Sequence, residues 1–578
     1  MATSFKNHNE YFQDGTKNSR RTKTQNPNGH PNFYSSKTGI YSSKHPLINL
    51  PSDPFLDVVT HIFSSKHKGV SALIDSSSGT SITYSQLHPL VQSVAGGLHQ
   101  MGVSQGDVVL ILMPNSIYFP VIFLGVLYLG AIVSTMNPLS SLLEIKKQAL
   151  DCNVTLAFTL PDKVDTFSTL GIPAVGVPEN LKSDNSAFYK LITSDLNSVP
   201  RPKINQQDTA AILYSSGTTG SSKGAMLTHG NFIAMVELFP RFEASQYEFI
   251  SEESVYLAAL PMFHIYGLSL FVMGLLSLGS TVVLMRKFDA DEMIRLIAKY
   301  GVTHFPVVPP LLTALTRAAK GVAINGLKSL KQVSSGAAPL SRISIEEFIQ
   351  ALPQVDFIQG YGMTETTAVG TRGFNTEQLC NYSSVGLLAP NMQAKVVDLI
   401  TGSFLPPGST GELWLRGPGV MQGYLNNVEA TLLTIDRDGW LRTGDIVYFD
   451  HDGYLHTVDR LKEIIKYKGF QIIYLCLTAY TNLQIAPADL EAVLSSHPDI
   501  VDTAVIAAED EEAGEVPVAF VVTRNGCAIS PSALVDYVAK KVAPYKKVRK
   551  VVFTHSIPRS ASGKILRREL RNFLPSKI

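Results

Sequence analysis

Cysteine is scarce in this sequence. The 578 residues include four cysteines, which lie far apart, form no Cys-X-X-Cys pair and have no histidine at zinc-ligand spacing: Cys152, Cys380, Cys476 and Cys527. This pattern argues against a disulfide framework and against a structural zinc site. It fits a protein of a reducing compartment.

Long uninterrupted apolar runs are also missing. The most apolar stretches, Phe119–Val133 and Leu268–Met285, are short or broken by Gly, Ser and Thr, so they predict buried helices and strands rather than membrane spans. Residues 1–30 contain few large apolar side chains and lack the core of a signal peptide, while Glu10 and Asp14 count against a transit peptide. We therefore expect a disordered arm at 1–30.

A strong excess of one charge is absent, because the formal net charge is +1. This balance gives no general attraction to nucleic acid or to an anionic membrane. The charge is uneven along the chain, however: Lys540–Lys577 carries twelve basic residues and one acidic residue, whereas Leu461–Ala539 carries four basic and eleven acidic residues. Nucleic acid, the phosphates of a small cofactor and a plain solvated face are three interpretations of the basic stretch.

The chain is too long for one hydrophobic core and alternates short apolar strands with amphipathic helices from about Pro54. In one such unit Asp289 or Asp291 begins a helix that ends at Gly301, Val302–Val308 forms a strand, and a second helix starts at Pro309. Strand, helix and strand in this order predict an α/β fold with mostly parallel sheets covered by helices.

Two later changes in pattern predict the domain organisation. Beyond Ser383 the chain is rich in strands and in Gly and Pro, which is typical of a small β-barrel or distorted sheet. After Arg460, helical patterns at Pro487–Ser496 and Pro531–Val542 lie among short strands and predict a separate α+β domain. We expect a large N-terminal domain over 31–459 and a small mobile C-terminal domain over 460–578.

The most informative motif is Tyr214–Asn231, which reads YSSGTTGSSKGAMLTHGN. Its hydroxyls and backbone N–H groups can surround a polyphosphate, and Lys223 adds a positive charge. It is not a Walker A loop, because Ser222 stands where that motif needs Gly and Gly224 where it needs a hydroxyl. A Ser/Gly-rich turn taken alone is an ordinary flexible loop about as often as a phosphate site, so the motifs that follow decide between the two.

Four further motifs follow in order along the chain. They are QGYGMTE at Gln359–Glu365, RTGD at Arg442–Asp445, VDRLKEIIKYKGFQ at Val458–Gln471 and PRSASGKILRREL at Pro558–Leu570. Together with the first motif they resemble the acyl-adenylate-forming superfamily, and in detail the plant 4-coumarate–CoA ligases and their ligase-like relatives. The resemblance implies an enzyme that uses ATP and Mg²⁺ to activate a carboxylic acid as an acyl-adenylate and then transfers the acyl group to coenzyme A.

The resemblance also implies which residues form the site. Glu365 would orient Mg²⁺, and Lys564 would bridge the substrate carboxylate and the α-phosphate. The residues implied to bind the nucleotide are Ser215, Ser216, Gly217, Thr218, Thr219, Gly220 and Lys223 at the outer phosphates, Ser335, Gly336, Ala337, Gln359, Gly360 and Tyr361 around the adenine, Thr364 at the α-phosphate, and Asp445 and Arg460 at the ribose.

The remaining implied residues concern the acid, the small domain and coenzyme A. His264, in PMFHIYGL, would be a core histidine if read alone, but the resemblance implies that it gates the acid or coenzyme A tunnel. The others are Lys462 at the hinge, Lys466 and Gln471 at the nucleotide or carboxylate, and Lys468 and Gly469 near the pantetheine arm.

The sequence departs from the family at three places. The sequence has GELWLRG at Gly411–Gly417 and TETTAV at Thr364–Val369, where the pattern of 4-coumarate ligases is GEICIRG and TEAGPV. These differences put hydroxycinnamate specificity in doubt. They favour the peroxisomal ligase-like group, which acts on fatty acids or jasmonate precursors. Thirteen residues, 472–484, interrupt the family pattern KGFQIAPADLE, so either Gln471 or Gln484 is the family's glutamine. This segment is apolar and uncharged, unlike a solvated loop.

Three functional hypotheses remain at this point. The first is a competent acid–CoA ligase, the second a non-catalytic or impaired homologue that binds nucleotide or coenzyme A, and the third an adenylating enzyme with another acceptor. The terminal Ser576-Lys577-Ile578 resembles the peroxisomal Ser-Lys-Leu address and predicts binding to the peroxisomal import receptor, with the cytoplasm as the alternative. The expected partner is otherwise a small carboxylic acid, with no nucleic acid and no transmembrane segment.

Overall fold

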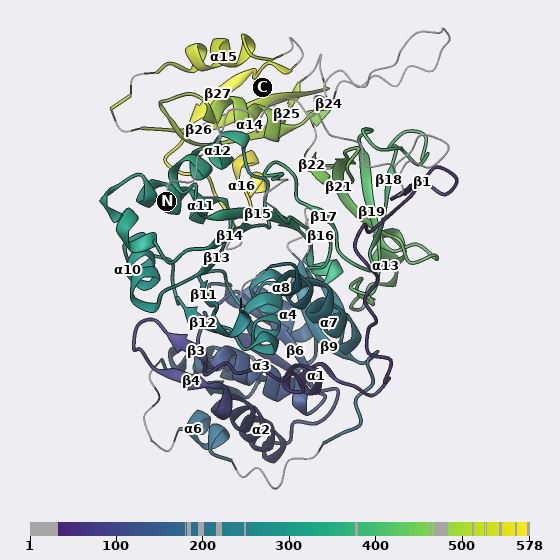
Figure 1. Ribbon diagram of the computed structural model, residues 1–578, viewed down its shortest axis with the longest axis vertical. Helices are drawn as coiled ribbons and strands as arrows, with labels where there is room; N and C mark the ends of the chain where they lie inside the picture. The colour runs from purple at the N-terminus through teal and green to yellow at the C-terminus, as the bar shows by residue number, and fades with distance from the viewer. Residues whose placement is uncertain are drawn as a thin grey trace, which may run out of the picture.

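The fold is taken from a computed structural model of the whole chain (Figure 1). The predicted arm at 1–30, residues 472–483 of the additional segment and the last four residues lie outside the part that is described. The described residues are 33–179, 181, 186–194, 201–215, 222–247, 250–375, 380–461, 463, 465–466, 484–510, 514–524, 526–527, 529–542, 546–560 and 563–574.

A nine-stranded sheet forms one half of the large N-terminal part. Its central strands pair in parallel and its edges are antiparallel, as the alternation of strands and helices predicts. In order across the sheet the strands are β17(Leu387–Leu388), β16(Thr371–Arg372), β15(Asp356–Tyr361), β14(Gln332–Ser335), β13(His304–Val307), β11(Val255–Ala258), β12(Thr281–Leu284), β3(Ser71–Asp75) and β4(Ser81–Thr83).

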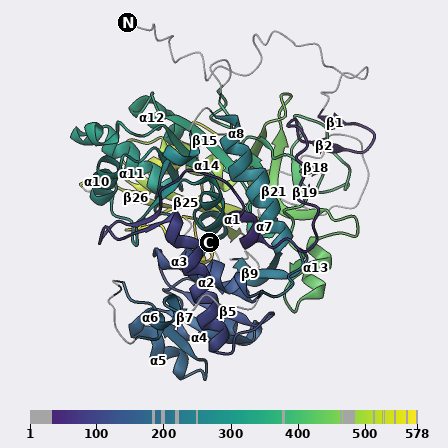
Figure 2. The same cartoon turned by 60° about the horizontal axis from the view of Figure 1, so that its bottom comes forward.

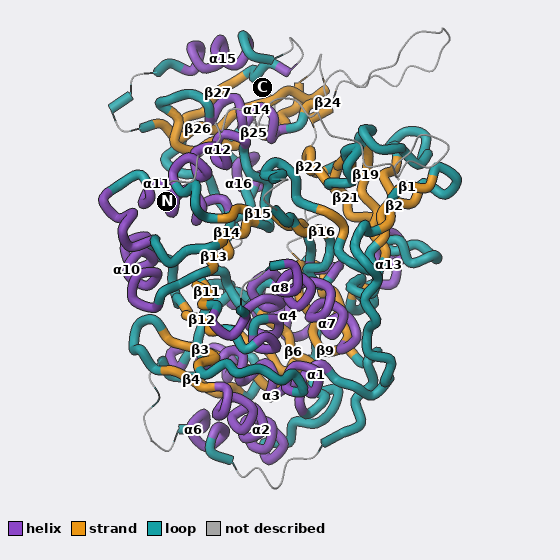
Figure 3. The backbone as a smooth tube through the Cα atoms, in the orientation of Figure 1, coloured by secondary structure: helices purple, strands orange, loops and turns teal. Residues whose placement is uncertain are grey.

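A seven-stranded sheet forms the second half. It is also parallel at its centre, and helices surround both sheets (Figure 3). Its strands in order are β20(Gly423–Tyr424), β10(Lys223–Thr228), β9(Thr209–Ser215), β6(Ile132–Thr135), β5(Val108–Leu112), β7(Val154–Thr159) and β8(Ala174–Gly176). The mostly parallel α/β architecture predicted from the sequence is confirmed.

The helices of this part begin and end largely where the sequence places its caps. Asp289, rather than Asp291, caps α10(Ala290–Tyr300), because its carboxylate accepts a hydrogen bond from Glu292 N at 2.8 Å, and Gly301 ends the helix in the left-handed region. The other helices are α1(Val58–Phe63), α2(Tyr84–Gln100), α3(Tyr118–Tyr128), α4(Leu142–Asp151), α5(Val164–Ser168), α6(Ala187–Ile192), α7(His229–Val236), α8(Phe242–Gln246), α9(Ile265–Gly267), α11(Pro309–Ala319), α12(Arg342–Ala351) and α13(Val428–Thr434).

The two most apolar runs are buried inside this part. Every residue from Tyr118 to Leu127 of α3 is buried, and Leu268–Gly274 forms a buried π-helical segment after α9. In the described part of the chain, no helix combines the length and apolar character that crossing a bilayer requires. Both apolar runs thus contribute buried elements of the fold, as the sequence predicts.

The strand-rich region beyond Ser383 divides among three sheets. Most of it forms a six-stranded antiparallel sheet on the side of the molecule opposite helices α10 to α12 (Figure 2). Two strands of the region beyond Ser383 belong to other sheets: β17 extends the nine-stranded sheet, and β20 pairs with β10 of the seven-stranded sheet. The six strands are β1(Tyr34–Ser35), β2(Ile40–Ser42), β18(Gln393–Val397), β19(Gly411–Arg416), β21(Leu441–Phe449) and β22(Leu455–Arg460).

The C-terminal residues form a small α+β unit at the top of Figure 1. Its apolar side chains pack into clusters of their own, separate from the core that runs from Phe33 to Leu455. Its elements are β23(Ile465–Lys466), β24(Gln484–Ile485), α14(Pro487–Ser495), β25(Ile500–Asp510), β26(Gly514–Thr523), α15(Pro531–Ala539), β27(Lys550–Phe553) and α16(Arg567–Arg571).

Candidate active site

One cavity of about 630 Å³ lies where the large part meets the small unit. This volume is in the usual range for a small-molecule site. The predicted site residues that line it are Lys223, His264, Gly336, Ala337, Gly360, Tyr361, Thr364, Glu365, Asp445, Arg460 and Lys564.

The phosphate-loop motif connects two paired strands. Ser215 ends β9 and lies in register with Lys223, which begins β10, so the loop leaves and re-enters the sheet at one point beside the cavity. The ammonium of Lys223 lies 5.0 Å from the ring centre of Tyr424. Residues Ser216, Gly217, Thr218, Thr219 and Gly220 lie outside the described residues.

The predicted adenine site is formed at the carboxyl ends of β14 and β15. These strands are parallel neighbours in which Ser335 lies opposite Gln359, so Gly336 and Gly360 approach each other closely. Ser335 and Gln359 are buried in the sheet and do not line the cavity, whereas Gly336, Ala337, Gly360 and Tyr361 do.

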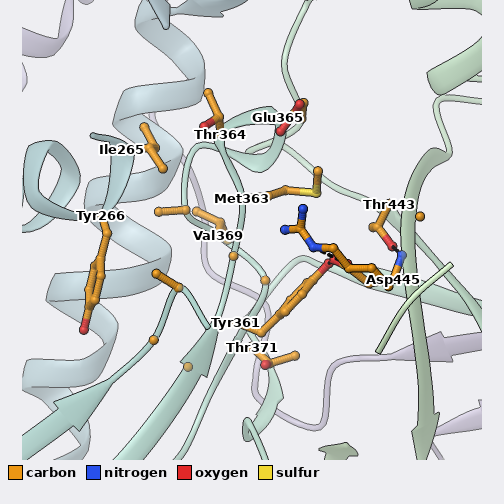
Figure 4. A pocket seen from close by; sticks show the side chains of 18 of the residues that line it. Ile265, Tyr266, Tyr361, Met363, Thr364, Glu365, Val369, Thr371, Thr443 and Asp445 are labelled. Atoms are coloured by element: carbon orange, nitrogen blue, oxygen red, sulfur yellow. Dashed lines mark hydrogen bonds and ion pairs between the residues drawn. The ribbon is translucent and has the colours of Figure 1, made fainter. Parts of the chain in front are cut away.

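The aromatic ring of Tyr361 connects this site to the predicted ribose site. Its hydroxyl donates to Asp445 Oδ2 at 2.6 Å, as Figure 4 shows, and Arg460 Nε lies 3.4 Å from Asp445 Oδ1. Asp445 and Arg460 face each other across the pair β21 and β22. Burial, followed by the nearby charge of Asp445, raises the pKa of Tyr361, so the phenol stays a neutral donor.

Thr364 and Glu365 lie in the single 3₁₀ turn η9(Thr364–Thr366), which directly follows β15. Glu365 is buried, and its Oε1 accepts a hydrogen bond from the Tyr424 hydroxyl at 2.9 Å. Thr367 takes a φ of +52° where the family's glycine would stand, a strained conformation for a β-branched residue. Its hydroxyl donates to Gly419 O at 2.8 Å, so a buried contact holds the strained turn.

Lys564 reaches the cavity from the small unit. The turn before it packs against the large part: Gly563 has a φ of +80°, and a Cβ built on it would lie 3.2 Å from Val308 and Pro310. Burial, and then the charge of Arg460, lower the pKa of Lys564 to about 8. The structure thus brings a lysine from the far end of the chain beside Asp445 and Arg460.

His264 lines the cavity and directly precedes Ile265 and Tyr266, which Figure 4 shows on the same side as Val369. Burial lowers its pKa to about 4, so the imidazole is neutral at pH 7. Leu238, Phe239 and Val369 also line the cavity, which makes this side suitable for the body of an organic acid.

The backbone after the ribose site bears on the ambiguous glutamine. Lys466 of β23 lies in register with Gln484 of β24, and Ile465 with Ile485. Gln484, one of the two glutamines that the sequence left as candidates, therefore pairs with Lys466 through its backbone. Lys462, Lys468, Gly469 and Gln471 lie outside the described residues.

Several cavity residues lie outside all of the sequence motifs. Tyr424 is 59 positions from Glu365, and only pairing of β20 with β10 brings it there. Arg372 lines the cavity from β16, and its ion-pair partner Glu243 is 129 positions away. A conserved tyrosine or arginine in an alignment is the kind of signal that finds such residues.

Comparisons with known proteins agree with this geometry. The family described as AMP-binding enzyme matches residues 62–425, and its C-terminal domain family matches residues 489–564. The protein 4-coumarate–CoA ligase-like 6 of Arabidopsis thaliana is 60% identical over 564 residues, which cover 96% of this chain and 97% of that protein. Peroxisomal OPC-8:0-CoA ligase 1 of the same plant is 44% identical over 552 residues, which cover 94% of this chain and 97% of that protein.

A solved structure shows the same fold. The o-succinylbenzoate CoA synthetase MenE from Bacillus subtilis, in complex with an acyl-adenylate intermediate, superposes with a TM-score of 0.75 at 25% identity and covers 90% of this chain and 99% of that one. Fold and cavity together define an acyl-adenylate-forming enzyme of the acid–CoA ligase class. The chain belongs to the AMP-binding enzyme family, among the plant 4-coumarate–CoA ligase-like proteins, and the resemblance predicted from its motifs is confirmed.

Proposed function

We propose that this enzyme joins a monocarboxylic acid with an extended apolar body to coenzyme A through an acyl-adenylate, and that the cavity residues have the roles implied by their motifs. The observation that carries the proposal is the position of Lys564. A partly buried cation from the small unit faces the same cavity as Thr364, Asp445 and Arg460 of the large part. Such an arrangement suits a reaction between two anions.

In the first step, a carboxylate oxygen of the acid attacks the α-phosphorus of ATP, and pyrophosphate leaves. Both reactants are negatively charged, so cations must offset the charge that builds up in the transition state. Lys564 and Arg460 supply positive charge from opposite domains, while Asp445 accepts hydrogen bonds from the ribose hydroxyls. No nucleophilic side chain is needed, because the acid itself attacks.

The residues present fit a magnesium ion carried by the nucleotide. Within the described residues, no group of three or more His, Cys, Asp or Glu side chains is arranged to hold a metal. Glu365 offers one buried carboxylate at the cavity, and Mg²⁺ commonly binds one or two carboxylates together with substrate phosphates. Mg²⁺ held there would neutralise phosphate charge, and Tyr424 would fix the orientation of Glu365.

In the second step, the thiol of coenzyme A attacks the acyl carbonyl and AMP leaves. We propose that the small C-terminal domain that follows Arg460 rotates about a hinge near Lys462, which withdraws Lys564 and brings Lys468 and Gly469 to the pantetheine arm. The separate hydrophobic clusters of the small unit support this division, because each unit has a core of its own. The register between Lys466 and Gln484 favours Gln484 as the glutamine of the site.

The acid substrate is proposed from the lining and from the relatives. The side chains of Leu238, Phe239, Ile265 and Val369 form an apolar wall that suits a hydroxycinnamate, a fatty acid or a jasmonate precursor. The similar proteins include 4-coumarate–CoA ligase-like 6 and Peroxisomal OPC-8:0-CoA ligase 1. His264, neutral and partly buried, is proposed to control entry on this side.

Two assays test the proposal against the other hypotheses. Acid-dependent ATP–pyrophosphate exchange must occur if the enzyme adenylates, and its absence with every acid of a broad panel would favour the impaired homologue. Formation of acyl-CoA then separates the CoA ligase from an adenylating enzyme with another acceptor. We also propose peroxisomal import through Ser576-Lys577-Ile578, and the similarity to Peroxisomal OPC-8:0-CoA ligase 1 supports this proposal.

A further inference from the structure

A buried ion pair forms part of the cavity wall. Arg372 of β16 lines the cavity, and its side chain is 9% exposed. Its Nη2 donates to Glu243 Oε1 of α8 at 2.8 Å, and its Nε lies 2.7 Å from Oε2 at an angle outside hydrogen-bond geometry. The guanidinium is therefore held in place by a neighbouring carboxylate.

The third guanidinium nitrogen of Arg372, Nη1, takes no part in the ion pair with Glu243. Among the described residues, Nη1 of Arg372 has no hydrogen-bond partner, although the nitrogen carries two N–H donors. It lies beside the backbone of Gly360, so closely that a Cβ on this glycine would be 3.2 Å away. Gly360 itself lines the cavity, so Nη1 is held at the cavity wall.

Polar groups surround the same point. The Tyr266 hydroxyl lies 3.4 Å from Ser334 Oγ, and Phe239 lies beneath the guanidinium with its ring centre 5.0 Å from Cζ. Arg372 also lines a second cavity of about 30 Å³, together with Glu243 and Ser334, with room for about one water molecule. The cavity wall around Arg372 is thus partly polar, and Glu243 holds its donor in place.

We propose that Arg372 is a specificity-determining residue whose Nη1 donates a hydrogen bond to a neutral oxygen of the acid, a carbonyl or a hydroxyl, at the end remote from the carboxylate. This inference rests on the proposed function and names its substrate class. It excludes a plain hydrocarbon end, because an acid without the oxygen leaves a buried N–H donor unpaired.

The ion-pair partner of Arg372, Glu243, indicates that the oxygen of the acid is neutral. Glu243 is 12% exposed and already neutralises the guanidinium, so a second carboxylate on the substrate would enter the pocket without a counter-charge. A neutral acceptor needs no counter-charge. Phenolic acids and keto acids share this chemistry, and the experiment distinguishes them.

The test compares acids in matched pairs by pyrophosphate exchange. The pairs are 4-hydroxycinnamate with cinnamate, and a fatty acid bearing a ketone near its far end with the plain acid of the same length; a dicarboxylic acid is added. The wild type is expected to favour the oxygenated member of at least one pair by roughly ten- to a hundredfold in kcat/KM, as for a hydrogen bond to a charged group. The pair that discriminates identifies the source of the oxygen.

The variant replaces both partners, Arg372→Met with Glu243→Met, because removing one alone leaves a buried charge unpaired. We expect this double variant to fold and to lose the preference to within about threefold, with the plain acid used as well as or better than before. The matched control, Lys320→Met with Glu347→Met, removes an exposed pair that does not line the cavity and should keep the preference.

The outcomes separate the two proposals. If no acid supports exchange in the wild type, the proposed function fails and this inference fails with it. If exchange occurs but the wild type does not discriminate within either pair, or favours the dicarboxylic acid, or if the double variant keeps the preference at an unchanged melting temperature, the role of Arg372 is refuted while the ligase function stands.

Discussion

Replacement of Lys564 is the sharpest test of the proposed chemistry. The side chain is largely buried at the cavity although it has no apolar core to support, and burial followed by Arg460 lowers its pKa to about 8. We expect Lys564→Met to abolish most adenylation and to leave the fold intact. A preorganised donor at a site of developing charge contributes about 3–4 kcal/mol, so the rate should fall roughly a hundred- to a thousandfold.

The same variant should not lose stability. An ordinary lysine has a pKa of about 10.4, so holding Lys564 charged in the folded state costs up to about 3 kcal/mol before its remaining exposure is taken into account. The sign follows from the lowered pKa: the cost is fully present below pH 8 and is relieved as the pH rises toward 10.4. Lys564→Met removes the cost, and its melting temperature at pH 7 should equal or exceed that of the wild type.

The pH profile gives an independent readout. Lys564 must carry its proton to offset charge, so kcat/KM for pyrophosphate exchange, which reports the free enzyme, should fall as the pH rises through about 8. Lys564→Arg keeps a charge that does not titrate in this range, so the alkaline fall should disappear in that variant whatever its absolute rate. Wild-type exchange by Lys564→Met, or an alkaline fall that persists in Lys564→Arg, would refute the assignment.

Three further expectations concern other parts of the chain. Glu365→Gln should slow exchange and shift its Mg²⁺ titration to higher concentration, whereas an unchanged titration would argue against a role at the metal. Deletion of residues 472–484 should leave nucleotide binding to the large domain intact, make acyl-CoA synthesis faster and make the protein more soluble. The rate should rise because misplacing site residues by about 1 Å can lower it roughly a hundredfold. Equal or lower activity, measured at matched amounts of folded protein, would show that the segment is an adapted element. A fluorescent fusion that leaves Ser576-Lys577-Ile578 free should enter peroxisomes and one lacking these residues should not, while a diffuse cytosolic signal from the intact fusion would reject the import signal.

Much of the fold is predictable from local sequence. The helix that Asp289 begins and Gly301 ends is determined by a side-chain cap and a left-handed residue, both of which act within a few positions. The same holds for Pro309, which starts α11 directly after a buried strand. Alternation of such units leads to parallel sheets because a right-handed crossover packs the helix back on the sheet. The sheet to which β17 and β20 belong was not predictable, since short edge strands carry no pairing signal.

The site divides in the same way. Its motifs identify the class of enzyme, because phosphate loops, turns and the lysine near the C-terminus are contiguous segments with their own chemistry. The sequence by itself determined that an acid is adenylated. Only the tertiary structure decided which side chains are in contact. Tyr361 contacts Asp445, 84 positions away, and Glu243 contacts Arg372, 129 positions away. Such contacts depend on how sheets and helices pack, and no local pattern records them, so the fold determines which side chains meet at the cavity wall.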